Sequence, residues 1–170
     1  MSVITRRLAR LRVTLGFVLG PLVLWLAAPT HTSFGLGVAV AFLGEGLRFW
    51  AAGHLSKSRE VTASGPYRLL AHPLYVGSAL MGVGLAIASA SFAAGGIIAA
   101  YLVVTLSAAI MSEEAFLTRT FGDEYTRYRG AAMGEGTRRF ELARAIGNRE
   151  HRALVGLLLV LAILAWKTAW

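Results

Sequence analysis

Apolar residues gather in five long runs along the chain, and short or polar segments separate them. The runs cover Val13 to Ala28, Phe34 to Ala52, Leu74 to Ala90, Phe92 to Met111 and Leu154 to Trp166. A helix of about 20 apolar residues crosses the hydrocarbon core of a bilayer. The last run is short, but extended over Ala153 to Trp170 it reaches roughly 27 Å. The pattern therefore predicts an all-α polytopic membrane protein with about five transmembrane helices, forming one domain over residues 1–170.

Composition supports a membrane protein. The 170 residues are 56% hydrophobic, and the mean hydropathy is +0.60, which is too apolar for an ordinary soluble domain. The absence of cysteine excludes disulfides and thiolate metal sites. The four histidines lack metal-ligand spacing, so we expect no metal site. The net charge of +8 comes from arginines between apolar runs, which is typical of a membrane surface, and we expect no nucleic-acid partner.

The basic residues also predict an orientation. They fall in the N-terminal segment, in Gly53 to His72 and in Glu113 to Arg152, whereas the loops at Thr30 to Ser33 and at Ser89 to Ser91 carry no Lys or Arg. The positive-inside rule then places the N-terminus in the cytoplasm and the C-terminus outside. The start resembles a signal peptide, but the proline at position 29 makes a poor cleavage site. We therefore expect a multi-pass protein of a bacterial inner membrane.

A polar, aromatic island separates the second and third runs, from Gly65 to Tyr75. Gly-Pro at its start is typical of a turn. Pro73 suits the first position of a helix, where its missing N–H has no cost. His72 is therefore expected at the mouth of a helix, with Tyr75 in its first turn. Such a mouth presents backbone N–H groups and a positive dipole to a ligand.

Glu45 and Arg48 lie inside the second apolar run, three residues apart and on one helix face. Ionisable groups at membrane depth are costly and are often functional. The alternative is an internal ion pair near the cytoplasmic end of the span, with the Arg48 side chain extending outward to the interface.

A second polar block follows the fourth run. It contains Glu113-Glu114, then Phe121 to Tyr125, then Tyr128-Arg129. In a continuous helix Glu114, Tyr125 and Tyr128 share one face, although Gly122 is a candidate break. Taken singly, these residues and His72 have plainer explanations, as helix caps, a solvated helix start or interfacial anchors.

Together the two blocks resemble the isoprenylcysteine carboxyl methyltransferase family and its relatives, the phospholipid methyltransferases. The similarity rests on Gly-Pro-Tyr-Arg, on His-Pro-Leu-Tyr-Val-Gly and on the second block, and it covers about Gly44 to Arg129. It leaves out the helix expected over Ala153 to Trp170. The family usually has Arg directly before His-Pro, where this chain has Ala71, so Arg68 is a candidate replacement. The resemblance implies an S-adenosylmethionine pocket on the cytoplasmic side, lined by Arg68, His72, Tyr75, Glu113, Glu114, Tyr125 and Tyr128.

The resulting hypothesis is S-adenosylmethionine-dependent methylation of a lipid-like or prenylated acceptor, either at a carboxylate oxygen or at a lipid amine. Membrane lipids and an amphiphilic small molecule are the expected partners. Glu45, Arg48 and Glu114 are the catalytic candidates. A lipid amine needs a proton acceptor, for which Glu45 or Glu114 are candidates. Two alternatives remain open: a non-catalytic membrane binding or assembly protein, and an NADPH-dependent membrane reductase. No G-x-G-x-x-G follows a predicted strand, which excludes a soluble Rossmann-type enzyme.

Overall fold

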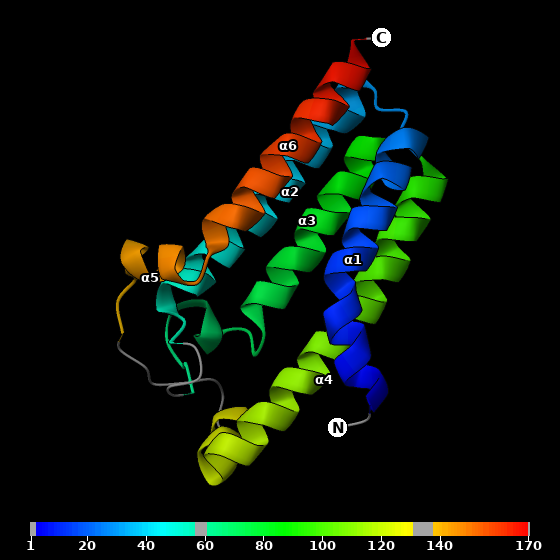
Figure 1. Ribbon diagram of the computed structural model, residues 1–170. Coiled ribbons are helices and arrows are strands. Elements are labelled where there is room, and N and C mark those ends of the chain that lie inside the picture. Colours follow the sequence, from blue (N-terminus) through cyan, green and yellow to red (C-terminus); the bar gives the residue numbers. More distant parts are fainter. Residues whose placement is uncertain (1–2, 57–60, 131–137, 170) are drawn as a thin grey trace.

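The computed structural model describes residues 3–56, 61–130 and 138–169, excluding the side chains of residues 3–13, 124 and 126–130. Over these ranges the chain is helical and contains no strand. The helices are α1 (Val3–Leu26), α2 (His31–His54), the 3-10 helix η1 (Gly65–Arg68), α3 (Pro73–Ser89), α4 (Phe92–Gly130), α5 (Leu142–Gly147) and α6 (Glu150–Thr168). The long helices run side by side as a bundle, and α5 and η1 lie at one end of it (Figure 1). The predicted all-α, polytopic membrane fold is confirmed.

Three of the described helices are long and apolar enough to cross a membrane: α2, the 92–123 part of α4, and α6. The apolar parts of the other two long helices, Thr14–Leu26 and α3, are shorter. With 17 residues, α3 spans about 26 Å, slightly less than a typical hydrocarbon core. Five spans therefore remain a prediction for the two shorter helices.

Two element boundaries differ from the sequence prediction. The expected loop from Thr30 to Ser33 is instead the N-cap and first turn of α2. The Thr30 side chain accepts a hydrogen bond from the Ser33 N–H at 3.1 Å, and Ser33 Oγ accepts one from the Thr30 N–H at 2.9 Å. This reciprocal capping satisfies two helix donors and starts the helix three residues early. At the other end of the bundle, α4 continues past Met111 to Gly130.

Gly122 interrupts α4, as its sequence position suggested. Its φ of 46° and ψ of −113° are non-helical, and glycine adopts such a positive φ without the penalty of a Cβ. The face that Glu114 and Tyr125 share in a continuous helix is therefore broken between them. The chain beyond Gly122 turns relative to the span, at the lower end of α4 in Figure 1.

Helices α2 and α3 approach each other backbone to backbone through small residues. A Cβ on Gly84 would lie 2.4 Å from the Ala41 nitrogen, and one on Gly44 would lie 2.6 Å from the Gly77 carbonyl oxygen. Gly84 and Ala88, four residues apart on α3, thus pack on α2.

Other small residues of the bundle differ in their surroundings. Gly82 faces Leu102 of α4, where its Cβ would meet Cδ1 at 2.1 Å. In α1, Gly16 lies near Tyr101, but nothing lies within 4 Å of a Cβ on Gly20. Gly20 lines a cavity instead of a close helix contact.

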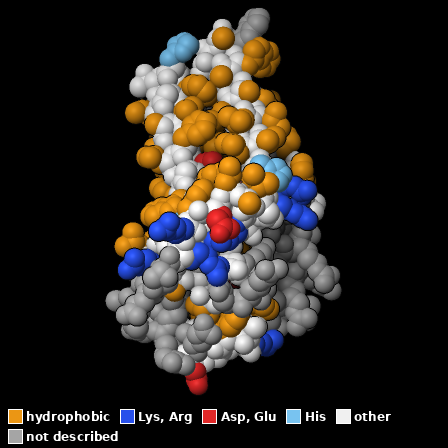
Figure 2. All heavy atoms as spheres, turned by 90° about the vertical axis from the view of Figure 1, so that its left-hand side faces the viewer, with side chains coloured by type: hydrophobic (Ala, Val, Ile, Leu, Met, Phe, Trp, Pro, Cys, Tyr) orange, Lys and Arg blue, Asp and Glu red, His pale blue; other side chains and the backbone are white. Residues whose placement is uncertain are grey.

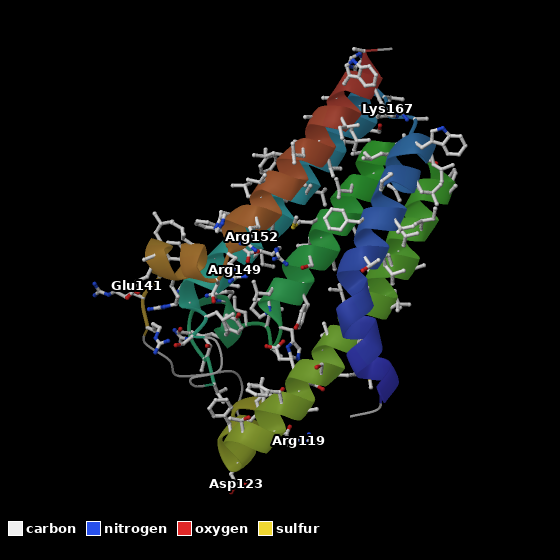
Figure 3. The ribbon with its side chains drawn as sticks, viewed as in Figure 1. Arg119, Asp123, Glu141, Arg149, Arg152 and Lys167 are labelled. Carbon is white, nitrogen blue, oxygen red and sulfur yellow. The ribbon has the colours of Figure 1, made fainter. Side chains whose placement is uncertain are left out.

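Helix α6 completes the bundle. Leu157 and Leu161 pack with Ala41 of α2 in one buried cluster, and Leu164 packs with Ala27 and Ala88 in a second. Near the C-terminal end, Lys167 Nζ donates hydrogen bonds to the carbonyls of Leu24, Trp25 and Ala27. Figure 3 shows Lys167 near one end of α6, and Arg149 and Arg152 near the other. The Lys167 hydrogen bonds therefore join the C-terminal end of α6 to the end of α1.

Figure 2 shows Lys and Arg side chains gathered below a hydrophobic band on one face of the molecule. We expect this basic end to be cytoplasmic. In the cysteine-free chain, single cysteines at Ser33 and Ser91 should react with an impermeant maleimide in intact cells. A cysteine at Arg139, beside α5, should react only after lysis. Ser58, which is also expected to be cytoplasmic, lies outside the described residues. Labelling of Arg139→Cys from outside intact cells would contradict the orientation.

Candidate functional site

His72 and the paired glutamates of α4 come together although 42 residues separate them. His72 Nε2 lies 3.3 Å from Oε1 of Glu114 and donates a hydrogen bond there when it carries the proton. Its Nδ1 lies 3.9 Å from Oε2 of Glu113. The His72 side chain is 13% exposed and the two carboxylates about one-third exposed, so the group is open to a ligand from the aqueous side. The structure thus unites residues from both predicted blocks.

The local sequence explains how His72 reaches this position. It is the N-cap of α3, in non-helical backbone geometry, and its side chain makes no capping hydrogen bond. Pro73 follows at the first helical position, as predicted. The imidazole is therefore directed to α4 instead of to the first turn of its own helix.

The preceding 3-10 helix is held in place by Gly65. This residue has a φ of +59°, and a Cβ on it would lie 2.6 Å from the ring of His54. His54 is 5% exposed, and its Nδ1 lies 3.0 Å from the Trp50 carbonyl oxygen. Both the backbone conformation and the close approach therefore require glycine. The sequence pattern alone suggests no role for His54. In the structure, this residue packs against the turn that carries the site.

The remaining predicted cofactor residues occupy different environments. The ring of Tyr75 lies beside that of His72, with centroids 5.8 Å apart and the planes tilted by 42°. Tyr125 is buried, 6% exposed, in the part of α4 after Gly122. Arg68 ends η1 and is exposed. The side chain of Tyr128 lies outside the described residues.

Glu45 and Arg48 form a second cluster, within the bundle. Arg48 Nε lies 3.7 Å from Glu45, its Nη2 pairs with Glu150, and its Nη1 donates to Ser78 Oγ and to the Leu74 carbonyl. Arg48 therefore turns inward and joins α2 to α3 and α6, so the outward extension considered from the sequence is wrong.

Sequence reasoning missed Glu150 and Ser78 as partners of Arg48. Glu150 begins α6 and its side chain is only 6% exposed. One signal was available, because Glu150 is the acidic residue directly before the last apolar run. A carboxylate at the edge of a span needs a partner in a buried setting.

A cavity of about 380 Å³ opens between α1, α3, α4 and α6. It follows α3 from Ser78 to Ser89, a length of about 16 Å along the helix. Arg48 lies at the Ser78 end, which is also the end of α3 that carries His72. Most of the wall is apolar, contributed by Leu19, Val23, Met81, Leu85, Ile98 and Leu164. This shape suits an extended apolar chain whose polar end lies towards Arg48.

Chemically, the His72 cluster offers carboxylates, an imidazole, an aromatic ring and the N-terminus of α3 within one small region. Carboxylates and aromatic faces bind cations, and helix N-termini bind anionic groups. Such a set of groups suits a ligand that carries a positive and a negative charge.

Comparison with known proteins shows what the chain resembles. The family model described as Phospholipid methyltransferase (PEMT) matches residues 12–124. This match begins nearer the N-terminus than Gly44, where the sequence similarity was placed. No solved structure matches the chain.

Two relatives are similar in sequence. The Nickel-cobalt-cadmium resistance protein NccN of Alcaligenes xylosoxydans xylosoxydans is 36% identical over 61% of this chain and 49% of its own length. The Cobalt-zinc-cadmium resistance protein CzcN of Cupriavidus metallidurans is 34% identical over 68% of this chain and 58% of its own length. The chain thus spans about half the length of these relatives.

Proposed function

The chain belongs to the phospholipid methyltransferase family, and from this membership we propose that it transfers a methyl group from S-adenosylmethionine to an amphiphilic acceptor in the bilayer. The observation that carries the proposal is the meeting of His72 with Glu114 at the mouth of α3. A ligand with a carboxylate, an amine and a sulfonium needs the mixed donors and acceptors that this cluster provides.

The cofactor would supply the methyl group. In the proposal, Glu113 and Glu114 accept hydrogen bonds from its amine or ribose hydroxyls, and the N-terminus of α3 faces its carboxylate. The ring of Tyr75 is assigned to the sulfonium, because aromatic faces stabilise such cations. Tyr125 and Tyr128 stay cofactor candidates from the family resemblance alone. Arg68 replaces the arginine that the family usually has at the position of Ala71.

The acceptor would lie with its tail in the cavity between α1, α3, α4 and α6 and its head near Arg48. Its oxygen or nitrogen forms the bond to the methyl carbon while the carbon–sulfur bond breaks, and the electron pair stays on sulfur. A carboxylate acceptor needs no base, whereas a lipid amine loses a proton, for which we propose Glu114. Positioning and exclusion of water supply most of the catalysis in such an in-line displacement.

Arg48 is proposed as a positioning residue for this step. Its Nη1 holds the start of α3 by donating to the Leu74 carbonyl and to Ser78 Oγ, and His72 lies two residues before Leu74. Glu45, although a catalytic candidate from the sequence, lines a different pocket and is given no part in the transfer.

The relatives' names concern resistance to nickel, cobalt, zinc and cadmium. Among the described residues, no group of three or more His, Asp and Glu side chains is arranged to hold a metal ion. The expectation of a metal-free enzyme stays a prediction for this chain. Metal content of the purified protein, measured by mass spectrometry, tests it, and a stoichiometric bound metal would contradict it.

An assay with tails of increasing length tests the proposed acceptor. With labelled S-adenosylmethionine, we expect label in phosphatidylethanolamines or in N-acetyl-S-prenylcysteines, and the rate should rise with tail length. Each buried CH₂ contributes about 0.8 kcal/mol. Gly20→Leu should lower the methylation rate of long-tailed acceptors, because the leucine side chain would occupy the cavity. Gly20 lines this cavity, and no atom lies within 4 Å of its Cβ position.

Gly35→Leu is the matched control for the acceptor assay. Gly35 is exposed near the N-terminal end of α2, and no atom lies within 4 Å of its Cβ position. Its substitution should leave the dependence on tail length unchanged. Equal turnover of tail-free glycerophosphoethanolamine or N-acetylcysteine would refute the lipidic acceptor.

A further inference from the structure

Glu45 is a buried carboxylate whose oxygens lack hydrogen bonds. The residue is 4% exposed, and neither Oε1 nor Oε2 has a hydrogen-bond partner in the described part of the chain. The nearest cationic atom is Arg48 Nε at 3.7 Å, but the terminal nitrogens of Arg48 are committed to Glu150, Ser78 and the Leu74 carbonyl. One guanidinium thus faces two carboxylates. A buried carboxylate without hydrogen bonds is costly when it is charged, and a cation in contact with Glu45 would lower this cost.

Glu45 also lines a pocket of about 380 Å³ whose walls are largely aromatic. The other lining side chains include Phe42, Phe49, Trp50, Phe140 and Leu154. Phe42, Trp50 and Phe140 are each slightly over 40% exposed, so the aromatic surface is accessible from outside the bundle. A carboxylate at the base of an aromatic-walled pocket is an arrangement that binds cations.

Packing fixes the far wall of this pocket. Phe140 lies 6.0 Å from Phe49, centroid to centroid, and 6.1 Å from His54. A Cβ on Gly53 would lie 2.1 Å from the Phe140 ring, so glycine at position 53 is needed for this contact. The backbone beside it is held as well, because Arg144 Nη1 donates to the Gly53 carbonyl at 2.9 Å. The wall is therefore built before any ligand binds.

We infer that this pocket binds a lipid headgroup that carries a methylated ammonium, with the cation between the aromatic rings and Glu45. A methylated ammonium is weakly hydrated and is attracted to aromatic faces, which is how aromatic cages recognise quaternary amines. The pocket lies at the basic end of the bundle, next to α5, at the level where lipid headgroups are expected. A lipid could keep its tails in the hydrocarbon beside α2 and α6.

The pocket is distinct from the proposed transfer site. It shares no residue with the His72 cluster, and the acceptor cavity is lined by Arg48 and not by Glu45. The inference therefore holds whether or not the chain transfers methyl groups, and binding at the two sites is measured separately.

Calorimetry with the full chain in maltoside micelles tests the inference. The probes are butyl- and octyltrimethylammonium, with 3,3-dimethylbutanol as an uncharged compound that has the same trimethylated head. Both cations should bind the wild type, the octyl compound more tightly, and the alcohol should not bind measurably. Glu45→Gln should lower the affinity for both cations about tenfold, and Trp50→Leu should also lower it.

Asp123→Asn is the matched control, because it removes an exposed carboxylate from α4, a helix that does not line the pocket. It should leave cation binding unchanged. Thermal unfolding of each variant shows whether it is folded, and Trp50→Leu keeps the test available if Glu45→Gln is not. Equal binding of the alcohol, or full cation affinity in folded Glu45→Gln and Trp50→Leu, would overturn the site. If the octyl compound binds no more tightly than the butyl compound, the assignment to a lipid is wrong.

S-adenosylhomocysteine is titrated into the same samples. Its affinity should be unchanged by Glu45→Gln, because that residue lies in the other pocket. Absence of cation binding by the wild type, with nucleoside binding retained, would refute this inference alone. Cation binding without any nucleoside binding would refute the proposed methyl transfer and leave the cation site standing.

Discussion

Substituting His72 by Ala is expected to weaken binding of S-adenosylhomocysteine roughly ten- to hundred-fold, because one hydrogen bond to a charged group contributes about 1.5–3 kcal/mol. Glu114→Gln should have an effect of the same size, since His72 Nε2 and Glu114 Oε1 are 3.3 Å apart. Isothermal titration calorimetry of the detergent-solubilised variants measures both. The midpoint of thermal unfolding should change little, because both side chains are partly exposed.

Two substitutions serve as controls for this prediction. His31→Ala removes an exposed histidine from the start of α2, and Glu141→Gln removes an exposed glutamate near α5. Both should bind the ligand as the wild type does. Wild-type affinity in both His72→Ala and Glu114→Gln would remove these residues from the cofactor site.

A single methyl group at Gly84 is expected to lower the unfolding midpoint by roughly 5–10 °C. Its Cβ would lie 2.4 Å from the Ala41 nitrogen and 2.6 Å from the Gly37 carbonyl oxygen, and both contacts are backbone atoms that no side-chain rotation relieves. The helices must separate, and overpacking of this kind costs about 1–3 kcal/mol, with a few degrees lost per kcal/mol in a chain of this size. Thermal unfolding in detergent measures the shift.

Gly35→Ala is the matched control and should have the opposite sign. Gly35 lies in α2 with nothing within 4 Å of its Cβ position. There alanine gains about 0.5–1 kcal/mol over glycine through helix propensity. A Gly84→Ala variant at least as stable as Gly35→Ala would show that α2 and α3 are less closely packed than the structure has them.

Local rules explain why much of the fold follows from the sequence. Each apolar run is long enough to form its own helix, and the His72-Pro73 dipeptide defines a helix start without reference to the rest of the chain. Gly122 was likewise recognisable as a break, because glycine tolerates the positive φ found there. In contrast, the early start of α2 depends on a side-chain cap between Thr30 and Ser33, which the apolar pattern alone does not show.

Contacts between distant segments were harder to predict. Glu45 and Arg48 looked sufficient as an ion pair three residues apart, so nothing in their spacing pointed to Glu150, about a hundred residues later. The contact of Gly44 with Gly77 depends on the rotation of two helices about their axes, which small residues permit but do not specify. The meeting of His72 with Glu114 was expected only from family resemblance, and the structure supplies the geometry.

The most direct measurement is a calorimetric titration of the wild-type chain, folded in detergent, with S-adenosylhomocysteine. The account predicts saturable binding at one site, accompanied by a higher unfolding midpoint, since a ligand that binds the folded state stabilises it. Folded protein that gives neither heat nor a thermal shift at millimolar ligand would contradict the assignment of this membrane protein as a methyltransferase.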